Sequence, residues 1–495
     1  MYLLGYDIGS SSVKASLLEA ESGVCKAFAT SPKEEMPILA KQAGWAEQDP
    51  EMWWLNLKLA TQELLLKANI KSELIKAVGI SYQMHGLVIV DKNQKLLRSS
   101  IIWCDSRAVS IGEKAFYEIG EKECLENLLN SPGNFTASKL KWVKDNEPEI
   151  FEKIDKIMLP GDYIAMRLTG EISTTVPGLS EGILWDFRKR NYAKLLLDHY
   201  GIPVGLLPNI IKTFSFQGKL TENAAKELGL SSGLIVAYRA GDQPNNALSL
   251  NVLNPGEIAA TAGTSGVVYG VSEQVKYDPQ SRVNTFAHVN HNGVLTRLGV
   301  LLCINGTGIL NSWLRKNVLP VGTSYTQMNQ MMSNIPVGSE GVSILPFGNG
   351  SERMLGNRNI GSVISGINFN IHSTSHILRA AHEGVVFAFH YGMEIMKGIG
   401  IDTKIIRAGY SNMFLSPVFR ETLANISDAR IELYETDGSQ GAARGAGIGT
   451  GFYKTPEEAF VGLKKNLVVE PSKTNKNQTI DAYSKWLNLL EKEMS

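Results

Sequence analysis

Short apolar runs alternate along the chain with longer amphipathic stretches, a pattern typical of an α/β protein. The short runs end at Gly, Ser or Asp and predict strands. They lie at residues 2–6, 13–18, 77–81, 87–90, 234–238, 257–261 and 267–269. Apolar residues at helical spacing predict helices at residues 51–67, 139–146 and 224–228, and residues 471–478 form a polar stretch that predicts a surface loop before a C-terminal helix.

One arrangement, a strand, a turn of small residues and a second strand, occurs twice in the sequence. The first copy surrounds residues 7–12 and the second surrounds residues 262–266, near the middle of the chain. An Asn-Pro-Gly sequence, typical of turns, lies between the halves and predicts a domain boundary at residues 251–255. The pattern suggests a duplicated architecture with a cleft between two domains, at residues 1–250 and 251–495.

Charge and cysteine content narrow the class of protein. Lys and Arg total 49 and Asp and Glu total 49, so the chain has no basic footprint for nucleic acid or an anionic membrane. The 4 cysteines have no zinc-site spacing and are too few for a disulfide framework. The N-terminus lacks the basic region of a signal peptide, and no apolar stretch approaches the ~18 residues that span a bilayer. We therefore expect a cytoplasmic protein.

The turn after the first strand has the composition of a phosphate-binding loop. Gly9 and the serines Ser10, Ser11 and Ser12 would offer backbone N–H groups and hydroxyls to phosphate oxygens. Asp7, at the end of the strand, is placed to hold a hydrated Mg²⁺, and Lys14 is a further phosphate partner. An ordinary polar hairpin explains this motif equally well on its own.

Gly263-Thr264-Ser265-Gly266 is a second candidate phosphate loop. Such turns are common, but two loops from two halves could together hold one triphosphate. The chain contains no G-x-x-x-x-G-K-[ST] motif and no complete G-x-G-x-x-G motif. The Ala/Gly run at residues 445–449 indicates close helix packing first and a nucleotide role second.

Asp242 follows the apolar run at residues 234–238 and is preceded by Gly241. A carboxylate in this place can take the proton of a hydroxyl nucleophile during phosphoryl transfer. The alternative is a turn aspartate that caps the next helix. Histidine pairs at 288/291 and 372/376 have metal-compatible spacing but lack partner acids, so we expect no metal site there. His382 and His390 are expected to pack on a helix, and Trp53 and Trp54 to lie in the core.

Taken together, these motifs resemble the FGGY carbohydrate kinases, and most of all the xylulokinases among them. The resemblance runs through nearly the whole chain, with the motifs in the same order. They are residues 7–14, Gly44-Trp45-Ala46-Glu47-Gln48-Asp49-Pro50 with Trp53-Trp54, Gln83-Met84-His85-Gly86, Trp103-Cys104-Asp105-Ser106-Arg107, Thr136 with Lys139-Leu140-Lys141-Trp142, Ser362 through Glu383-Gly384, and Gly409 to Asn412 with Ser416-Pro417.

The resemblance implies two actin-like ATPase (ribonuclease H-like) domains that flank a deep cleft. It implies transfer of the γ-phosphate of ATP, as its Mg²⁺ complex, to a sugar hydroxyl, with Asp242 as the general base. The sugar would contact Gln83, Met84, His85, Asp242 and Gln243. Asp7 would orient Mg²⁺ through water. The nucleotide would contact Ser10, Ser11, Ser12, Lys14, Gly263, Thr264, Gly308, Ser312, Gly409 and Asn412.

Three departures from the family pattern leave the sugar open. Gln243-Pro244 follows the catalytic aspartate, where xylulokinases usually have Asn; an Asp-Gln pair resembles glycerol kinases. Asn134 replaces the usual opening of the first signature and is a candidate to face the sugar, and His382 replaces an apolar residue. D-xylulose, giving D-xylulose 5-phosphate, is the first expectation. Gluconate, glycerol or another polyol or ketose comes second, and an inactive sugar sensor or actin-like assembly protein third. A homodimer is common in the resembled family.

Overall fold

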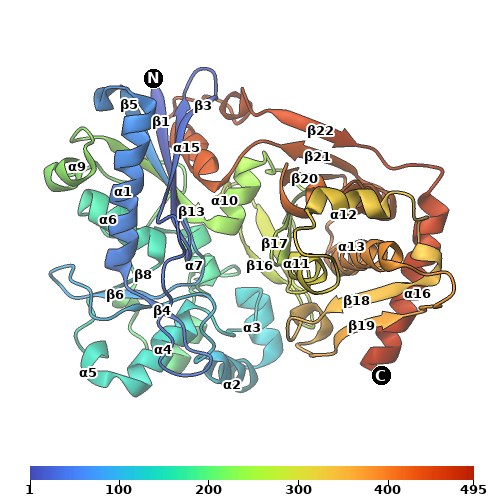
Figure 1. Ribbon diagram of the computed structural model, residues 1–495. Coiled ribbons are helices and arrows are strands. Elements are labelled where there is room, and N and C mark those ends of the chain that lie inside the picture. The colour runs from blue at the N-terminus through green and yellow to red at the C-terminus, as the bar shows by residue number, and fades with distance from the viewer.

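Two twisted mixed sheets form the centres of the two halves of the chain. The computed structural model describes residues 1–495 (Figure 1). The first sheet has the order β13 (Ile235–Gly241), β5 (Ile75–Tyr82), β1 (Tyr2–Ile8), β2 (Val13–Glu19) and β3 (Cys25–Ser31). The second has the order β16 (Asn284–Ala287), β17 (Leu298–Ile304), β15 (Gly266–Ser272), β14 (Glu257–Ala262), β20 (Ile405–Gly409), β21 (Arg430–Tyr434) and β22 (Lys465–Val469).

The two sheets share one topology. In each, three strands pair antiparallel in chain order, β1-β2-β3 in the first sheet and β14-β15-β17 in the second. The opening strand of each set then pairs in parallel with a later strand, β5 or β20, and that strand with β13 or β21. The predicted duplication is therefore confirmed at the level of strand order, although the two halves share no long identical stretch.

Helices cover both sheets, and five short strand pairs form separate two-stranded sheets. The helices are α1 (Pro50–Ala68), α2 (Val109–Ile119), α3 (Glu121–Leu128), α4 (Thr136–Asn146), α5 (Pro148–Phe151), α6 (Pro160–Thr169), α7 (Val176–Glu181), α8 (Lys194–Tyr200), α9 (Glu222–Leu228), α10 (Asp242–Ser249), α11 (Gly308–Asn317), α12 (Tyr325–Met332), α13 (Thr374–Gly398), α14 (Pro417–Ser427), α15 (Gly438–Gly449) and α16 (Lys476–Met494). The strand pairs are β4 (Glu47–Gln48) with β7 (Ser100–Ile101), β6 (Val88–Val90) with β8 (Lys156–Met158), β9 (Ser173–Thr175) with β12 (Asn209–Ile211), β10 (Trp185–Asp186) with β11 (Asn191–Tyr192), and β18 (Ser343–Phe347) with β19 (Gly361–Ser365).

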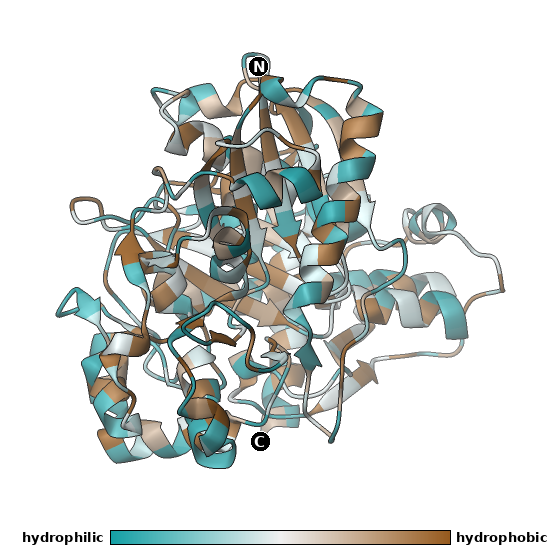
Figure 2. Cartoon of the chain, turned by 90° about the vertical axis from the view of Figure 1, so that its left-hand side faces the viewer, coloured by the Kyte–Doolittle hydropathy of each residue, from teal (hydrophilic) through white to brown (hydrophobic).

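Helix α1 shows how the sequence builds these layers. Asp49 caps its N-terminus by accepting from the Glu51 N–H, and Pro50 occupies the first turn, where no N–H is needed. Trp53 and Trp54 belong to the hydrophobic core of this half and are 0% and 2% exposed, so their predicted place in the core is confirmed. In Figure 2 the strands at the centre are mostly brown, whereas the outer helices carry teal faces toward the solvent.

Helix α15 comes from the C-terminal half of the sequence but packs on the N-terminal sheet, against β1, β2, β5 and β13. The backbones approach so closely that a Cβ on Gly5 would lie 1.8 Å from the Ser439 carbonyl oxygen, and one on Gly449 would lie 1.9 Å from that of Ala237. The predicted close packing of residues 445–449 is thus confirmed. Because α15 crosses from one half to the other, the division at residue 250 stays a prediction.

The predicted strands and helices all occur, and the differences are at their ends. The helix predicted at residues 139–146 begins at Thr136, and the C-terminal helix begins at Lys476, inside the predicted loop. Polar residues such as Asn475, which stands at the N-cap position of α16, make such starts hard to separate from a loop by composition alone. Among the helices, none has the length and apolarity that a bilayer crossing requires.

Candidate functional site

The predicted catalytic residues gather at one edge of the N-terminal sheet. Asp7 lies near the end of β1, Asp242 directly follows β13, and residues 83–86, which we call the sugar loop, follow β5. These three strands are parallel neighbours, so their carboxyl ends meet at the same edge. Ligands of open α/β sheets bind at this edge.

Asp242 is the first residue of α10 and is partly exposed. Burial raises its pKa to about 7, and the nearby Asp7 carboxylate acts in the same direction. The backbone N–H and the side-chain amide of the adjacent Gln243 oppose this rise. Asp242 opens the helix, but its side chain makes no capping hydrogen bond. A pKa near neutrality is compatible with a general base, and that role stays a prediction.

A second carboxylate, Glu181 at the end of α7, lies behind Asp242. It is 1% exposed, and a Cβ on Gly241 would lie 2.5 Å from one of its oxygens. Burial raises the pKa of Glu181 well above its ordinary range, and the charge of Asp242 raises it further. The pair therefore favours a neutral Glu181 beside an ionisable Asp242. No motif surrounds Glu181 in the sequence, so sequence reasoning missed it.

In the sugar loop, Met84 and His85 lie against this site. Met84 is 4% exposed, and its Cγ would lie 2.6 Å from a Cβ on Gly241. The Nδ1 of His85 lies 2.9 Å from the carbonyl oxygen of Glu181, and burial lowers the pKa of His85 to about 3. The ring is therefore neutral, with a proton on Nδ1 that it donates to the carbonyl, and its Nε2 remains as an acceptor. The ring packs edge-on against Phe135 at 4.8 Å and also contacts Phe286.

Gln83 has a different environment from its two neighbours. Its side chain is 2% exposed and donates to the Oε1 of Gln48 at 3.3 Å. Gln48, which is fully buried, also accepts from Trp53 Nε1 and donates to the carbonyl oxygen of Ser10 at 2.7 Å. Direct contact of Gln83 with a sugar stays a prediction that this geometry does not support. Instead, Gln83 and Gln48 connect the sugar loop to the first phosphate loop, residues 9–12.

The first phosphate loop is a tight turn with exposed polar groups. The Gly9 N–H donates to the Ser12 carbonyl oxygen at 3.0 Å, Ser11 is exposed, and Ser10 and Ser12 are partly exposed. Asp7 accepts from Ser81 Oγ at 2.8 Å and is paired in register with Lys14. Burial raises the pKa of Asp7, while Lys14 lowers it.

The second phosphate loop opens a pocket in the C-terminal half. Carbonyls of Gly263 and Thr264 accept from the N–H groups of Gly308 and Ile309 at 3.0 Å, and so hold the first turn of α11 against the loop. The cavity beside them has a volume of about 420 Å³ and contains no Asp, Glu, Lys or Arg in its lining. Of the predicted nucleotide residues, the lining includes Gly263, Thr264, Gly308, Ser312 and Asn412.

For two residues near this pocket, Gly409 and His382, the structure differs in detail from the prediction. Gly409 ends β20, three residues before Asn412, and is outside the lining. His382 is packed on α13 as expected, but it also lines the pocket and lies 3.2 Å from Asn311 Oδ1 through its Nε2. In the same half, the charge of Asp242 raises the pKa of Cys303, and Arg353 lowers the pKa of His85. Phe286 also contacts the His85 ring, so residues of both halves lie near the predicted catalytic residues.

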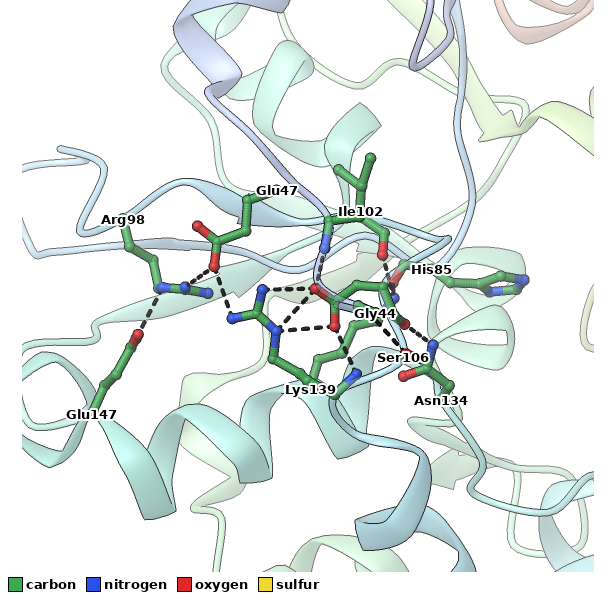
Figure 3. Close-up of polar contacts among 12 residues, drawn as sticks. Gly44, Glu47, His85, Arg98, Ile102, Ser106, Asn134, Lys139 and Glu147 are labelled. Carbon is green, nitrogen blue, oxygen red and sulfur yellow. Dashed lines mark hydrogen bonds and ion pairs between the residues drawn. The ribbon is translucent and has the colours of Figure 1, made fainter. Parts of the chain in front are cut away.

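An ion network lies beside the sugar loop (Figure 3). Arg107 pairs with Asp105 at 2.7 Å and with Glu47 at 2.8 Å. Arg98 pairs with the same Glu47 at 2.5 Å and with Glu147 at 2.9 Å. The guanidinium of Arg107 also stacks 3.8 Å from the Trp45 ring centroid. The Gly-Trp-Ala-Glu and Trp-Cys-Asp-Ser-Arg motifs thus meet in one cluster.

The histidines of the two pairs take part in hydrogen bonds within the protein. His288 is completely buried; its Nε2 donates to the Val252 carbonyl at 3.0 Å and its Nδ1 accepts from the Tyr269 hydroxyl. No group of three or more His, Cys, Asp or Glu side chains is arranged to hold a metal ion. A Mg²⁺ site built on Asp7 alone therefore needs ligands from water and phosphate, as Mg²⁺ commonly has.

Comparisons with known proteins agree with this geometry. The model of the FGGY family of carbohydrate kinases, N-terminal domain, matches residues 2–249. The chain is 28% identical to the xylulose kinase of Bacillus subtilis strain 168, covering 92% of this chain and 90% of the relative, and 29% identical to that of Escherichia coli K12, covering 98% and 96%.

Solved structures show the same fold over the whole chain. The xylulose kinase of Rhodospirillum rubrum superimposes with a TM-score of 0.89 at 24% identity, covering 99% of both chains. The gluconate kinase of Lactobacillus acidophilus gives 0.90 at 22% identity, covering 100% of this chain and 98% of the other. The family match, the named relatives and the shared fold lead to one conclusion: the chain belongs to the FGGY family of carbohydrate kinases, with the actin-like ATPase fold, and is an ATP-dependent sugar kinase.

Proposed function

We propose that the protein phosphorylates a ketopentose, D-xylulose before others, with Asp242 as the general base and Mg²⁺ as the metal ion. The observation that carries the proposal is the place of Asp242. The preceding residue, Gly241, packs against Met84 of the sugar loop, and the Asp242 carboxylate, with a pKa of about 7, is close enough to Asp7 to be affected by its charge. The base, the sugar loop and the predicted metal residue thus occupy one edge of one sheet.

The chemistry assigned to Asp242 is simple. The carboxylate accepts the proton of the attacking hydroxyl as the new oxygen–phosphorus bond forms and the bond from the γ-phosphorus to the β–γ bridging oxygen breaks. Such a base contributes roughly 10²–10⁴-fold to the rate. Gln243, whose amide lowers the pKa of the same carboxylate, would orient it toward the hydroxyl. This arrangement gives the Gln at 243 a role that does not depend on direct sugar contact.

The residues present fit ATP and its metal ion. The cavity of about 420 Å³ has an uncharged lining suited to a nucleoside, and a Cβ on Gly263 would find no atom closer than 3.8 Å, so the backbone there is open to a phosphate. Mg²⁺, when bound, would neutralise charge on the phosphates and align them. Asp7 would orient its water ligands, while Ser10, Ser11, Ser12, Lys14 and Thr264 would contact phosphate oxygens.

The choice of sugar rests on the relatives and on His85. The named relatives above are xylulose kinases, and the neutral His85 ring offers an acceptor to a sugar hydroxyl. A gluconate carboxylate would add negative charge beside Asp242 and Asp7, which would raise the pKa of Asp242 further. The two proposed domains, residues 1–250 and 251–495, would close on the sugar and keep water from attacking ATP.

A substrate panel tests the proposal. ATP consumption would be measured with purified protein, Mg²⁺, and a series of ketopentoses, gluconate and glycerol, with ATP alone as the control for hydrolysis. We expect the highest kcat/KM for D-xylulose. A preference for gluconate or glycerol would overturn the substrate assignment, and a flat panel would favour an inactive sensor or an assembly protein on the same scaffold.

A further inference from the structure

Lys139, on the first turn of α4, is a fully buried cation that the proposed chemistry does not use. Its side chain is 0% exposed and has no carboxylate within ion-pair distance. Burial lowers its pKa to about 7, and the charge of Asp105 opposes this change. Removing an ammonium group from water is costly unless its protons find acceptors. The acceptors that Lys139 has found therefore indicate what the residue does.

Those acceptors are two backbone carbonyl oxygens from two segments that border the predicted sugar site. The Nζ of Lys139 donates to the carbonyl oxygen of His85 at 2.9 Å and to that of Ile102 at 2.9 Å. His85 belongs to the sugar loop, and Ile102 precedes Trp103, whose indole lies 3.4 Å from Ser10 Oγ in the first phosphate loop. Figure 3 shows the His85 ring directed away from the cluster while its backbone lies beside Lys139.

The backbone of His85 needs such support. Its φ is 63°, in the left-handed region that residues other than glycine rarely adopt. Lys139 holds the carbonyl that this conformation directs inward, while the Glu181 carbonyl holds the ring through Nδ1. Both the backbone carbonyl and the ring of His85 are therefore held by hydrogen bonds, and the ring Nε2 is left as an acceptor.

The segment that carries Lys139 makes further contacts with the same two stretches of chain. Asn134 Nδ2 donates to the Asp105 carbonyl oxygen, and Thr136 Oγ1 lies 3.5 Å from that of Gly86. The ion network holds Asp105 in turn, through Arg107. With Lys139 the cluster contains three cations and three carboxylates, so the buried charge is balanced.

We propose that Lys139 is a positioning residue for the acceptor sugar: its ammonium group holds the carbonyls of His85 and Ile102 so that the Nε2 of His85 faces a sugar hydroxyl. The inference rests on the proposed sugar-kinase function, which it deepens. It also assigns a role to the lysine of the Thr136 to Trp142 motif, for which the proposed mechanism has no use.

The test compares Lys139→Met with Lys141→Met. Lys141 lies on the same helix, but its partner is Asp145 on the surface. Lys139→Met loses hydrogen bonds made by a charged group, so we expect its sugar KM to rise about 10- to 100-fold. The ATP KM and the kcat at saturating sugar should change by less than about 3-fold. Lys141→Met should match the wild type.

A second readout does not require turnover. Hydrogen exchange of residues 83–87, measured without ligand, should be faster in Lys139→Met than in Lys141→Met. If the wild type phosphorylates no sugar, the proposed function fails, but this measurement still decides whether Lys139 holds the loop.

A purely structural role would have a different signature. It would reduce the amount of folded enzyme, and so the apparent kcat, and leave the sugar KM as it is. That result, or an unchanged sugar KM with unchanged exchange of residues 83–87 in folded Lys139→Met, overturns the proposal. Should Lys139→Met not fold, Lys139→Gln replaces it, because Gln keeps an uncharged hydrogen-bond donor. The same two readouts then decide the question. The sugar KM of Lys139→Gln is expected to lie between the wild-type value and a value about 10-fold higher.

Discussion

The proposed sugar side and the proposed nucleotide side of the site are built in opposite ways. The sugar side, in the N-terminal half, is dense in ionisable groups: Asp242, Glu181, His85 and Lys139 all have shifted pKa values because they are buried near one another. The nucleotide side is an open pocket without charged side chains, formed largely by glycines, hydroxyls and amides. Nevertheless, the two sides occupy comparable positions in two sheets of the same topology.

This difference shows which features of the site depend on side chains and which on backbone. Phosphates can be held by N–H groups from any small residue at a tight turn, so the nucleotide side tolerates changes of side chain but not of backbone path. A sugar differs from its competitors in the positions of hydroxyls, which only well-placed side chains can distinguish. Four experiments test this difference between the two sides: three are substitutions and one is a pH profile.

The largest effect is expected from Asp242→Asn, which removes the proton acceptor but keeps the shape. We expect kcat to fall roughly 10²–10⁴-fold, while ATP binding, measured by calorimetry, is largely kept. Asp198→Asn, on the exposed face of α8, is the matched control. Normal turnover by Asp242→Asn would remove the residue from the role of base.

Gly308→Ala should weaken ATP binding by displacing the backbone of the second phosphate loop. A Cβ at this position would lie 2.2 Å from the Gly263 carbonyl oxygen, so the second phosphate loop must shift. Overpacking of this kind leads us to expect a loss of about 10- to 100-fold in kcat/KM for ATP, with the sugar KM little changed. Gly398→Ala, where a Cβ meets nothing within 4 Å, serves as control. An equal rise in the sugar KM would contradict the division between the two sides.

The pH profile should report the sugar side alone. Because burial and Asp7 raise the pKa of Asp242 to about 7, the carboxylate is protonated below this pH and cannot act as a base. We expect kcat to rise about 10-fold per unit at acid pH and to level off above about pH 7. Asp242 and Asp7 interact, so the apparent value belongs to the pair. A flat profile from pH 5.5 to 8 in folded enzyme would exclude Asp242 as the base.

The smallest effect is expected from Gln48→Leu, because Gln48 lies between the two loops and contacts no predicted ligand. Its loss would leave the Ser10 carbonyl, the Trp53 N–H and the Gln83 amide without this partner. Slight misalignment should lower kcat by about 3- to 10-fold, with both KM values within about 2-fold. Gln62→Leu, exposed on α1, is the control. Unchanged kcat would show that the loops are aligned without Gln48.

Much of the fold could be predicted from the sequence because its strands are short apolar runs bounded by turn residues. The duplication was visible in the two strand-turn-strand units around residues 7–12 and 262–266. The buried network was not, because Glu47, Arg98 and Glu147 are charged residues far apart in the chain, and charge alone predicts a solvated surface. Glu181 was missed for the same reason. Gln83 lies in the predicted motif, but its direction depends on Gln48, which pattern alone does not show.

The path of α15 has a consequence for how the protein is made. This helix covers the N-terminal sheet, which is synthesised first. The ribosome must therefore translate past Gly449 before α15 can pack on that sheet. Until then, the apolar face of β1, β5 and β13 is available to chaperones or to other nascent chains. A gene fragment that stops at residue 250 would encode a sheet with one uncovered face, and would aggregate rather than yield an independent sugar-binding module.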